Sequence, residues 1–337
     1  LDTAMRAEAK LDLARTLIMA GQNAEALQML DDLVQQQPSN IADVARLAGD
    51  LSYQNRQYDD AVDYYQIITT GHQVSPHFPA AAMGVLWSHH ARENPEALIA
   101  AYRRFADALP RHLKPGAAYL ASLAYQRLHR HADAAELLMQ VTRQFPDAEI
   151  ADQLLYRLAI SQSELEQYRQ MEQTLMRLLA AYPQTPLRPD AMFLLAQADA
   201  EQGNAARGVA RLTEIVEQGP DHPYFLSSLL QRARLYEQNQ RFEPAIEDYN
   251  RYLEFCEYER IPGSENGETI FKPTQTQAKI LLRLLDLSYR NQQFEETQQI
   301  AAQWFRLMQL PPEIEQEAMY RVALSHIKTA ENDKAID

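Results

Sequence analysis

Two consecutive stretches of the chain share one pattern of residues. The first is ADQLLYRLAISQSELEQYRQMEQTLMRLLAAYP, residues 151–183, and the second is PDAMFLLAQADAEQGNAARGVARLTEIVEQGP, residues 189–220. Their closing prolines, Pro183 and Pro220, are 37 residues apart. The same step, or one residue less, continues towards the N-terminus at Pro146, Pro110 and, two steps further, Pro38. A fixed period of this length predicts a solenoid built from stacked helical units.

The composition agrees with a helical array. Only 10 of the 337 residues are glycine, and the abundant Ala, Leu, Gln, Glu and Arg all favour helices. No long stretch alternates apolar and polar residues with the period of two that is typical of a half-buried strand. The length alone would suggest about two domains. Because each unit of a repeat array packs only on its neighbours, we instead expect residues 1–337 to form a single all-α domain.

The repeating unit is predicted to be a pair of helices. The first pair is expected over about residues 3–20 and 23–37, with Gly21 between the helices and Pro38 after them. Small residues recur on both helices, where they allow two helix backbones to approach closely. On the first helices these are Ala14, Gly49, Ser122, Ala159, Ala196, Ala233 and Ala323. On the second helices they are Ala26, Ala61, Ala134, Gly208, Ala245 and Ala335.

This pattern of small, aromatic and proline positions resembles the tetratricopeptide repeat family. The clearest copy is RLYEQNQRFEPAIEDYNRYLE, residues 234–254, and the resemblance covers nearly the whole chain. It implies a right-handed α-solenoid of antiparallel helix pairs, with about eight repeats and a truncated ninth that begins near Gln316. Because Asp337 falls inside that ninth repeat, we expect the chain to be part of a larger protein.

One insertion interrupts the period at residues 257–276. Ala245 and Thr297, which hold equivalent places in successive repeats, are 52 residues apart instead of about 37. Pro262, Gly263 and Gly267 indicate that this segment is irregular. Loops often carry function, but surface insertions are also tolerated at little cost in free energy, and the sequence leaves both interpretations open.

The charge of the chain argues against two classes of partner. The net charge is −14 and the pI about 5.1, with no basic stripe of the kind that neutralises nucleic-acid phosphates or binds acidic membrane surfaces. No apolar run approaches the ~20 residues of a membrane span, so we expect no direct membrane insertion. The single cysteine, Cys256, excludes an internal disulfide and a cysteine-based zinc site.

The sequence offers no catalytic, cofactor-binding or metal-binding motif. It contains no glycine-rich phosphate loop, no GxSxG and no HExxH. Adjacent acids on a helix point about 100° apart and do not converge on a substrate; the pairs concerned are Asp31–Asp32, Asp59–Asp60 and Glu295–Glu296. Clustered histidines lack the spacing of a metal site and are expected at the surface or in loops: His72, His77, His89, His90, His129 and His131. We therefore predict a protein without enzymatic activity, cofactor or metal.

The resemblance also implies a binding groove. In the family, the first helix of each repeat lines the concave side of the solenoid. Carried over by position, the groove residues are Tyr53, Met83, Trp87, Tyr119, Tyr156, Phe193, Leu230 and Tyr289. Aromatic side chains suit protein recognition because they bury a large area with few rotatable bonds. The alternative is that these residues only fill the space between helices, as apolar residues at helical spacing usually do.

The predicted function is a scaffold that binds an extended or helical segment of a partner protein. The linkers between repeats resemble those of long-repeat arrays in bacterial cell-envelope proteins. That resemblance implies a periplasmic or envelope location and a role in outer-membrane assembly, or in a polysaccharide-export or secretion complex. Two alternatives stay open: a cytoplasmic docking or regulatory domain of an enzyme or signalling protein, and a structural array formed by copies of the chain as a homo-oligomer.

Overall fold

The computed structural model describes residues 3–261 and 270–329, and about three quarters of these residues are helical. They form two compact units. Unit 1 comprises the chain up to Tyr182 and unit 2 the chain from Pro183 onward. The prediction of an all-α solenoid of helix pairs is confirmed within each unit. The prediction that residues 1–337 make a single domain stays a prediction.

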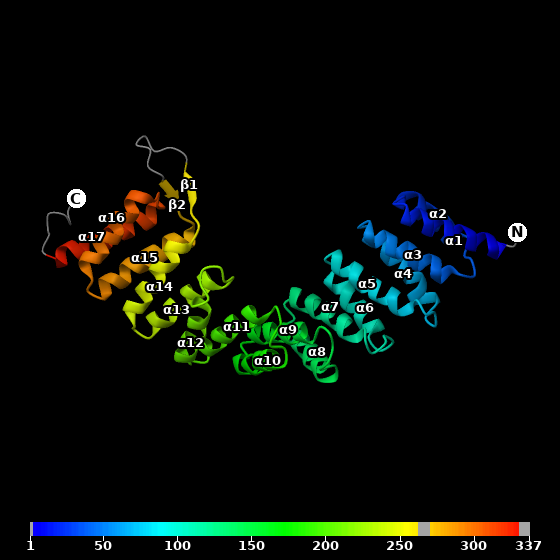
Figure 1. Cartoon of the computed structure of the whole chain (residues 1–337), viewed down its shortest axis with the longest axis horizontal. Helices are drawn as coiled ribbons and strands as arrows, with labels where there is room; N and C mark the ends of the chain where they lie inside the picture. The colour runs from blue at the N-terminus through cyan, green and yellow to red at the C-terminus, as the bar shows by residue number, and fades with distance from the viewer. Residues whose placement is uncertain (1–2, 262–269, 330–337) are drawn as a thin grey trace. The chain divides into compact units, whose positions relative to one another are not determined.

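Unit 1 consists of five helix pairs, in which each helix packs against the one before it and the one after it (Figure 1). Their bounds are α1 (Thr3–Met19), α2 (Asn23–Gln35), α3 (Ile41–Gln54), α4 (Tyr58–Gly71), α5 (Phe78–Ala91), α6 (Pro95–Phe105), α7 (Lys114–Arg127), α8 (His131–Gln144), α9 (Ala151–Glu164) and α10 (Tyr168–Ala181). The first helices of successive pairs also touch one another: α3 contacts α5, α5 contacts α7 and α7 contacts α9. They therefore form a continuous layer.

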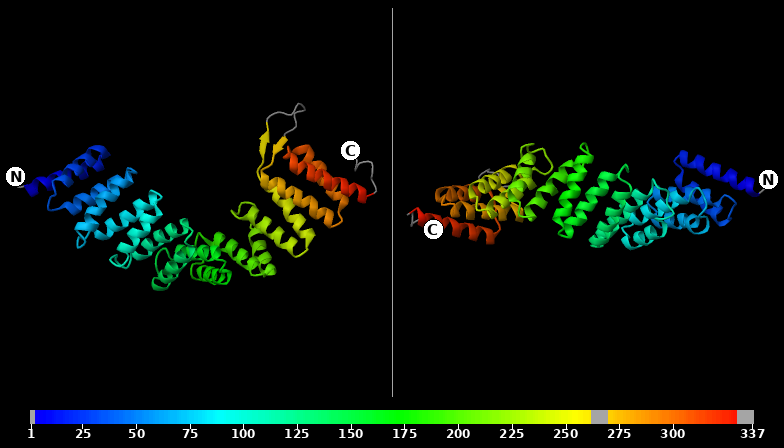
Figure 2. Two further views of the ribbon diagram at one scale, coloured as in Figure 1. Left: turned by 180° about the vertical axis from the view of Figure 1, so that it is seen from behind. Right: turned by 90° about the horizontal axis from the view of Figure 1, so that it is seen from below.

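Unit 2 continues the same arrangement with three pairs and one further helix (Figure 2). Its helices are α11 (Arg188–Glu201), α12 (Ala205–Val216), α13 (Phe225–Gln238), α14 (Phe242–Phe255), α15 (Gln275–Arg290), α16 (Phe294–Leu307) and α17 (Pro312–Lys328). The described residues thus hold the eight predicted pairs and the first helix of a ninth. The second helix expected for that ninth repeat, with Ala335, lies outside the described residues.

The turn between the two helices of every pair contains one residue in the left-handed region of backbone conformation. These residues are Gly21, Arg56, Glu93, His129, Glu166, Gly203, Gln240 and Gln292. The amide after each of them closes the turn; for example, the Gln57 N–H donates to the Ser52 carbonyl at 2.8 Å. This is the usual way in which a helix end satisfies its last carbonyls. Glycine adopts this conformation without strain, yet only Gly21 and Gly203 signal it in the sequence.

Small residues bring the helices of a pair together, as predicted. Ala14, Ala159 and Ala233 are completely buried at the centres of their first helices. At Gly208 on α12, an added Cβ atom would come within 3.1 Å of the Leu235 side chain and 3.2 Å of the Ala196 carbonyl. The helix backbones at these crossings are thus too close for larger side chains.

The tightest contact joins successive pairs in unit 1. The ring of Tyr65 on α4 lies between Gly49 of α3 and Gly84 of α5, and its hydroxyl donates to Asp50 at 2.8 Å. An added Cβ at Gly49 would lie 2.6 Å from the ring, and one at Gly84 would also lie closer than 3.0 Å. A single tyrosine therefore sets the spacing between the first helices of the second and third pairs.

Replacing Gly84 with alanine is expected to destabilise unit 1 by about 1–3 kcal/mol, because the ring or a helix must shift to admit the methyl group. In an unhindered helix the same change stabilises by roughly 1 kcal/mol, so the sign of the effect is informative. The control is Gly71→Ala, where an added Cβ meets nothing within 4 Å. Urea unfolding measures both variants. A G84A protein at least as stable as the wild type would contradict this packing.

The insertion contains the one pair of strands among the described residues. Strand β1 (Glu259–Ile261) pairs with β2 (Ile270–Lys272) in an antiparallel manner, and the residues between them lie outside the described part. The Phe271 carbonyl accepts a 3.0 Å hydrogen bond from the Gln309 amide, which fixes β2 beside the end of α16. A capping box between Thr274 and Gln277 then starts α15. The ends of the segment predicted to be irregular are thus ordered against unit 2.

Two buried carboxylates in unit 2 were not predicted from the sequence. Asp248 on α14 is 2% exposed and binds Arg232 of α13 through two hydrogen bonds of 2.6 and 2.8 Å. Arg232 also donates to the Thr213 hydroxyl on α12 at 2.9 Å, so that it links three helices. Asp199 is fully buried and pairs with Arg207 and Arg211 at 2.7 Å each. Because every one of these acids has an arginine partner, their role is structural.

Candidate functional site

The structure places all eight predicted groove residues on first helices. Tyr53, Met83, Tyr119, Tyr156, Phe193, Leu230 and Tyr289 are half-buried, whereas Trp87 is exposed to 42%. Each of the eight therefore keeps some solvent-exposed area. Their use as a binding surface stays a prediction, and the structure shows which of them come together.

Trp87 and Tyr119 line one pocket in unit 1. This pocket, of about 560 Å³, lies where α5 and α7 run beside each other, and Leu123 of α7 is part of its wall. Met83 lies one turn before Trp87 on α5, and its methyl group is 3.8 Å from the point where a Cβ on Gly116 would be. Three of the predicted residues therefore follow one seam between two neighbouring first helices.

Phe193 and Leu230 line a second pocket, of about 610 Å³, between α11 and α13 in unit 2. The Phe193 ring stacks on Tyr224, with ring centres 4.8 Å apart and planes 20° from parallel. The wall is otherwise rich in polar side chains, among them Gln197, Gln231 and Gln238. This pocket is therefore more polar than the one in unit 1.

The remaining three predicted residues do not join these pockets. Tyr53 packs against Tyr58 with ring centres 5.3 Å apart, and Tyr289 packs against Phe294 at 5.4 Å. Both partners open the second helix of the same pair, so these tyrosines fill the space within a pair, and burial raises the pKa of Tyr53. Tyr156 is half-buried on α9 and lines neither of the two pockets described above.

Two arginines stand at the rim of the unit 1 pocket. The Arg157 guanidinium of α9 lies over the Tyr119 ring, 5.8 Å from its centre. Arg127 of α7 pairs with Glu93 at 2.6 Å, and both side chains are largely exposed. The pocket therefore combines an aromatic and aliphatic wall with a cationic rim. This rim was not predicted from the sequence, because the role of an arginine there depends on neighbours that are distant in the sequence.

His89 corrects one prediction. It was expected at the surface or in a loop, but it lies on α5 with only 8% of its area exposed, on the wall of the unit 1 pocket. Burial, assisted by the nearby Arg92, lowers the pKa of its imidazole. Its Nδ1 atom has no hydrogen-bond partner among the residues that the structure describes. His89 is therefore a neutral packing residue at neutral pH.

This burial predicts a pH-dependent stability. In the unfolded chain His89 takes up a proton near pH ~6.5, whereas the folded protein resists protonation until a lower pH. Unit 1 should therefore lose stability as the pH falls below ~6.5, down to the lowered pKa of the folded state. The variant His89→Gln should show a smaller loss between pH 7 and 5 in thermal unfolding. The control is His112→Gln at an exposed position. Equal losses in wild type and H89Q would contradict the assignment.

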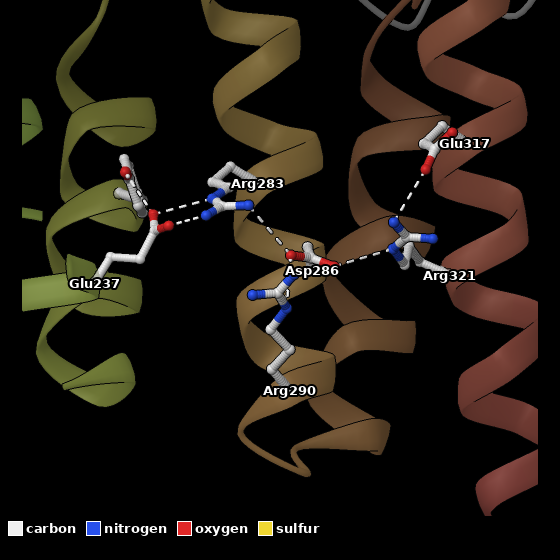
Figure 3. A network of polar contacts seen from close by, with 7 residues as sticks. Glu237, Arg283, Asp286, Arg290, Glu317 and Arg321 are labelled. Atoms are coloured by element: carbon white, nitrogen blue, oxygen red, sulfur yellow. Dashed lines mark hydrogen bonds and ion pairs between the residues drawn. The ribbon is translucent and has the colours of Figure 1, made fainter. Parts of the chain in front are cut away.

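A network of ion pairs links side chains on α13, α15 and α17 of unit 2 (Figure 3). Asp286 of α15, with a side chain only 14% exposed, contacts Arg283 at 3.3 Å, Arg290 at 3.0 Å and Arg321 at 3.2 Å. Arg283 also donates to Glu237 of α13 at 3.0 Å. Arg321 of α17 pairs in addition with Glu317 at 3.0 Å. The network joins three first helices, and most of its charged groups are paired with other members of the network.

Asp286 is expected to matter more for stability than the outer members of this network. Replacing it with alanine leaves three arginines without their shared carboxylate and should cost about 1–2 kcal/mol, reduced from the value for a buried pair because the arginines are partly exposed. The control Glu317→Ala removes a half-exposed carboxylate with one partner and should cost less than about 0.5 kcal/mol. Urea unfolding at low salt compares the two. Equal costs would contradict a central role for Asp286.

Two kinds of feature are absent from the described residues. Between residues 3 and 261 and between 270 and 329, no three His, Cys, Asp or Glu side chains are grouped so that they could hold a metal ion. Within the same ranges, each helix is too short or too polar to span a lipid bilayer.

Comparison with family models identifies the repeats. Models described as tetratricopeptide repeat match residues 4–51, 46–112, 156–223 and 226–257, which together exceed half of the chain. A search of curated proteins found no match to the sequence.

Solved structures share the fold. The C-terminal part of a TPR repeat-containing protein from Cytophaga hutchinsonii is 10% identical, with 87% of this chain and 99% of that chain covered and a TM-score of 0.53. A tetratricopeptide repeat protein from Parabacteroides merdae is 15% identical, with coverages of 74% and 93% and a TM-score of 0.47. MamA from Desulfovibrio magneticus RS-1 is 17% identical, with coverages of 52% and 94% and a TM-score of 0.46. At these identities the likeness concerns the fold alone, and it rests on the Cytophaga structure.

Proposed function

The chain belongs to the tetratricopeptide repeat family, and from that premise we propose that it is a non-enzymatic scaffold that binds a partner protein on the first helices of unit 1. Repeats of this family are interaction modules, which supports protein binding as the general function. The bound element is proposed to be an extended or helical segment, since both present side chains at regular intervals to a row of parallel helices.

One observation carries the proposal: the exposure of Trp87 beside Tyr119 and Leu123 in a pocket between α5 and α7. Leaving a large indole 42% exposed to water costs free energy that a covering partner would recover. The pocket volume of about 560 Å³ lies within the range of sites that enclose a ligand group. Tryptophan and tyrosine are also the residues that most often dominate the binding energy of protein interfaces.

Unit 2 offers a less favourable surface for an apolar segment. Its equivalent helices carry the Asp286 network, whose charged groups would have to be desolvated beneath any apolar partner. The pocket between α13 and α15 is likewise lined by Arg234, Lys279 and Arg283. The contrast between an aromatic seam in unit 1 and a charged face in unit 2 favours unit 1 as the docking surface.

A library of random 12-residue peptides displayed on phage tests the proposal. The chain is immobilised, bound peptides are selected, and their affinities are measured by calorimetry. The double variant Trp87→Ala with Tyr119→Ala should bind the selected peptides with an affinity at least about 30-fold lower than that of the wild type. The reason is that two aromatic contacts of about 1–2 kcal/mol each are lost.

The control for this experiment is Met176→Ala, at an exposed apolar residue on the second helix α10. It should leave the affinities unchanged. Circular dichroism confirms that both variants remain helical and unfold cooperatively. Peptides that bind the Trp87 and Tyr119 double variant as tightly as the wild type would refute unit 1 as the docking surface.

We further propose that the scaffold works in a bacterial cell envelope, in an outer-membrane assembly, polysaccharide-export or secretion complex. The support is the resemblance of the inter-repeat linkers, such as residues 180–203, to those of envelope arrays. A cytoplasmic docking domain and a self-assembling homo-oligomer are the competing proposals. Fractionation of the source cells with an antibody to the chain should place it in the envelope fraction. Recovery only from cytosol would favour the first competitor, and a concentration-dependent mass in sedimentation would favour the second.

A further inference from the structure

The charges around the unit 1 pocket differ from those of the chain as a whole. Besides His89, the histidines and charged residues of its lining are His90 in the last turn of α5, Glu93 after that helix, Arg127 at the end of α7, and Arg157 on α9. Two arginines face one glutamate, so the lining is net positive. The whole chain, in contrast, carries a net charge of −14. The protein as a whole is strongly acidic, yet the rim of this aromatic pocket is cationic.

Arg157 has no carboxylate partner among the residues that the structure describes. Its guanidinium lies over the Tyr119 ring, and within residues 3–261 and 270–329 its N–H donors make no ion pair. A guanidinium presents several donors in a planar fork that matches the two oxygens of a carboxylate. Stacking on an aromatic ring leaves the edge of that fork free for such a bond.

The helix that carries Arg157 is tied to the pocket wall. The Gln126 side chain of α7 donates to the Arg157 carbonyl at 2.9 Å and to the Ser161 hydroxyl at 2.8 Å, both on α9. These bonds hold the backbone of α9 beside Tyr119 before any ligand arrives. An anchored arginine loses less conformational entropy on binding than one on a mobile segment.

Arg127 supplies a second cation with a replaceable partner. It pairs with Glu93, but the side chains are 50% and 69% exposed, and exposed ion pairs of this kind contribute little free energy. A carboxylate of a ligand that enters the pocket can therefore exchange with Glu93 at small cost. Both arginines are consequently able to accept an incoming anion next to the Trp87 and Tyr119 wall.

We propose that the segment bound by unit 1 presents a bulky apolar or aromatic side chain next to an aspartate or glutamate. The apolar side chain packs against Trp87, Tyr119 and Leu123, and the carboxylate accepts hydrogen bonds from Arg157, with Arg127 adding charge. This inference rests on the proposed function and specifies the partner as an acidic, apolar-containing protein segment. Because the protein and such a segment are both acidic, binding depends on the local rim rather than on overall charge attraction.

The selected peptides themselves provide the test. We expect them to be enriched in Asp or Glu within two positions of a large apolar residue. In one such peptide, replacing that acid with its amide should weaken binding to the wild type by about tenfold, as expected for loss of a charge-assisted hydrogen bond. The Arg157→Gln variant should have a similarly reduced affinity for the acidic peptide, and it should bind the acid and amide forms of the peptide equally tightly. Arg157→Lys, which keeps the charge without the fork, should be intermediate.

The matched control is Arg143→Gln, at an exposed arginine on the second helix α8 of unit 1, which should change nothing. Circular dichroism establishes that each variant is folded. Selected peptides without enriched acids, or an acid-to-amide change that costs nothing in the wild type, would overturn the inference while binding still depends on Trp87 and Tyr119. Loss of that aromatic dependence would instead overturn the proposed function.

Discussion

The close approach of helix backbones at small residues is the constraint on which the rest of the structure depends. Where Gly49 and Gly84 flank the Tyr65 ring, there is no room for a methyl group, and fully buried alanines hold the equivalent crossings elsewhere. Close crossings align the first helices of neighbouring pairs in unit 1 as one layer. Side chains from two such helices can then share a pocket, as Trp87 and Tyr119 do.

The sequence predicts this architecture well because the constraint is local and periodic. Small residues at a fixed spacing, prolines after second helices and the 37-residue step indicate eight pairs and a ninth first helix, as the structure has them. The turns were harder to recognise. Six of the eight left-handed turn residues are not glycine, for example Glu166 and His129. The hydrogen bonds of the turn stabilise their left-handed conformation, so the residue type alone does not reveal it. The strands of the insertion depend on contacts with α16 that no local pattern reveals.

The candidate site was predicted only in part, for a physical reason. Position in the repeat predicts which residues face the same side, and in the structure Trp87 and Tyr119 lie on neighbouring helices. Position in the repeat does not show whether a side chain is covered by the other helix of its own pair, as Tyr53 is by Tyr58. Nor does it show whether a charged side chain has a partner of opposite charge. In the sequence, neither Arg157 nor Asp286 has a recognisable partner. In the described part of the chain, Arg157 has no carboxylate partner, whereas Asp286 binds three arginines.

The central claim is that a partner segment covers the aromatic seam of unit 1, and the indole of Trp87 reports this directly. Trp87 and Trp304 are the two tryptophans of the chain, so a Trp304→Phe background isolates the signal of Trp87. Titration with a selected peptide that lacks tryptophan should shift the emission of Trp87 to shorter wavelength and protect it from iodide quenching, as its exposed face is covered. Saturating peptide, verified by calorimetry, that leaves both the emission and the quenching unchanged would contradict the account.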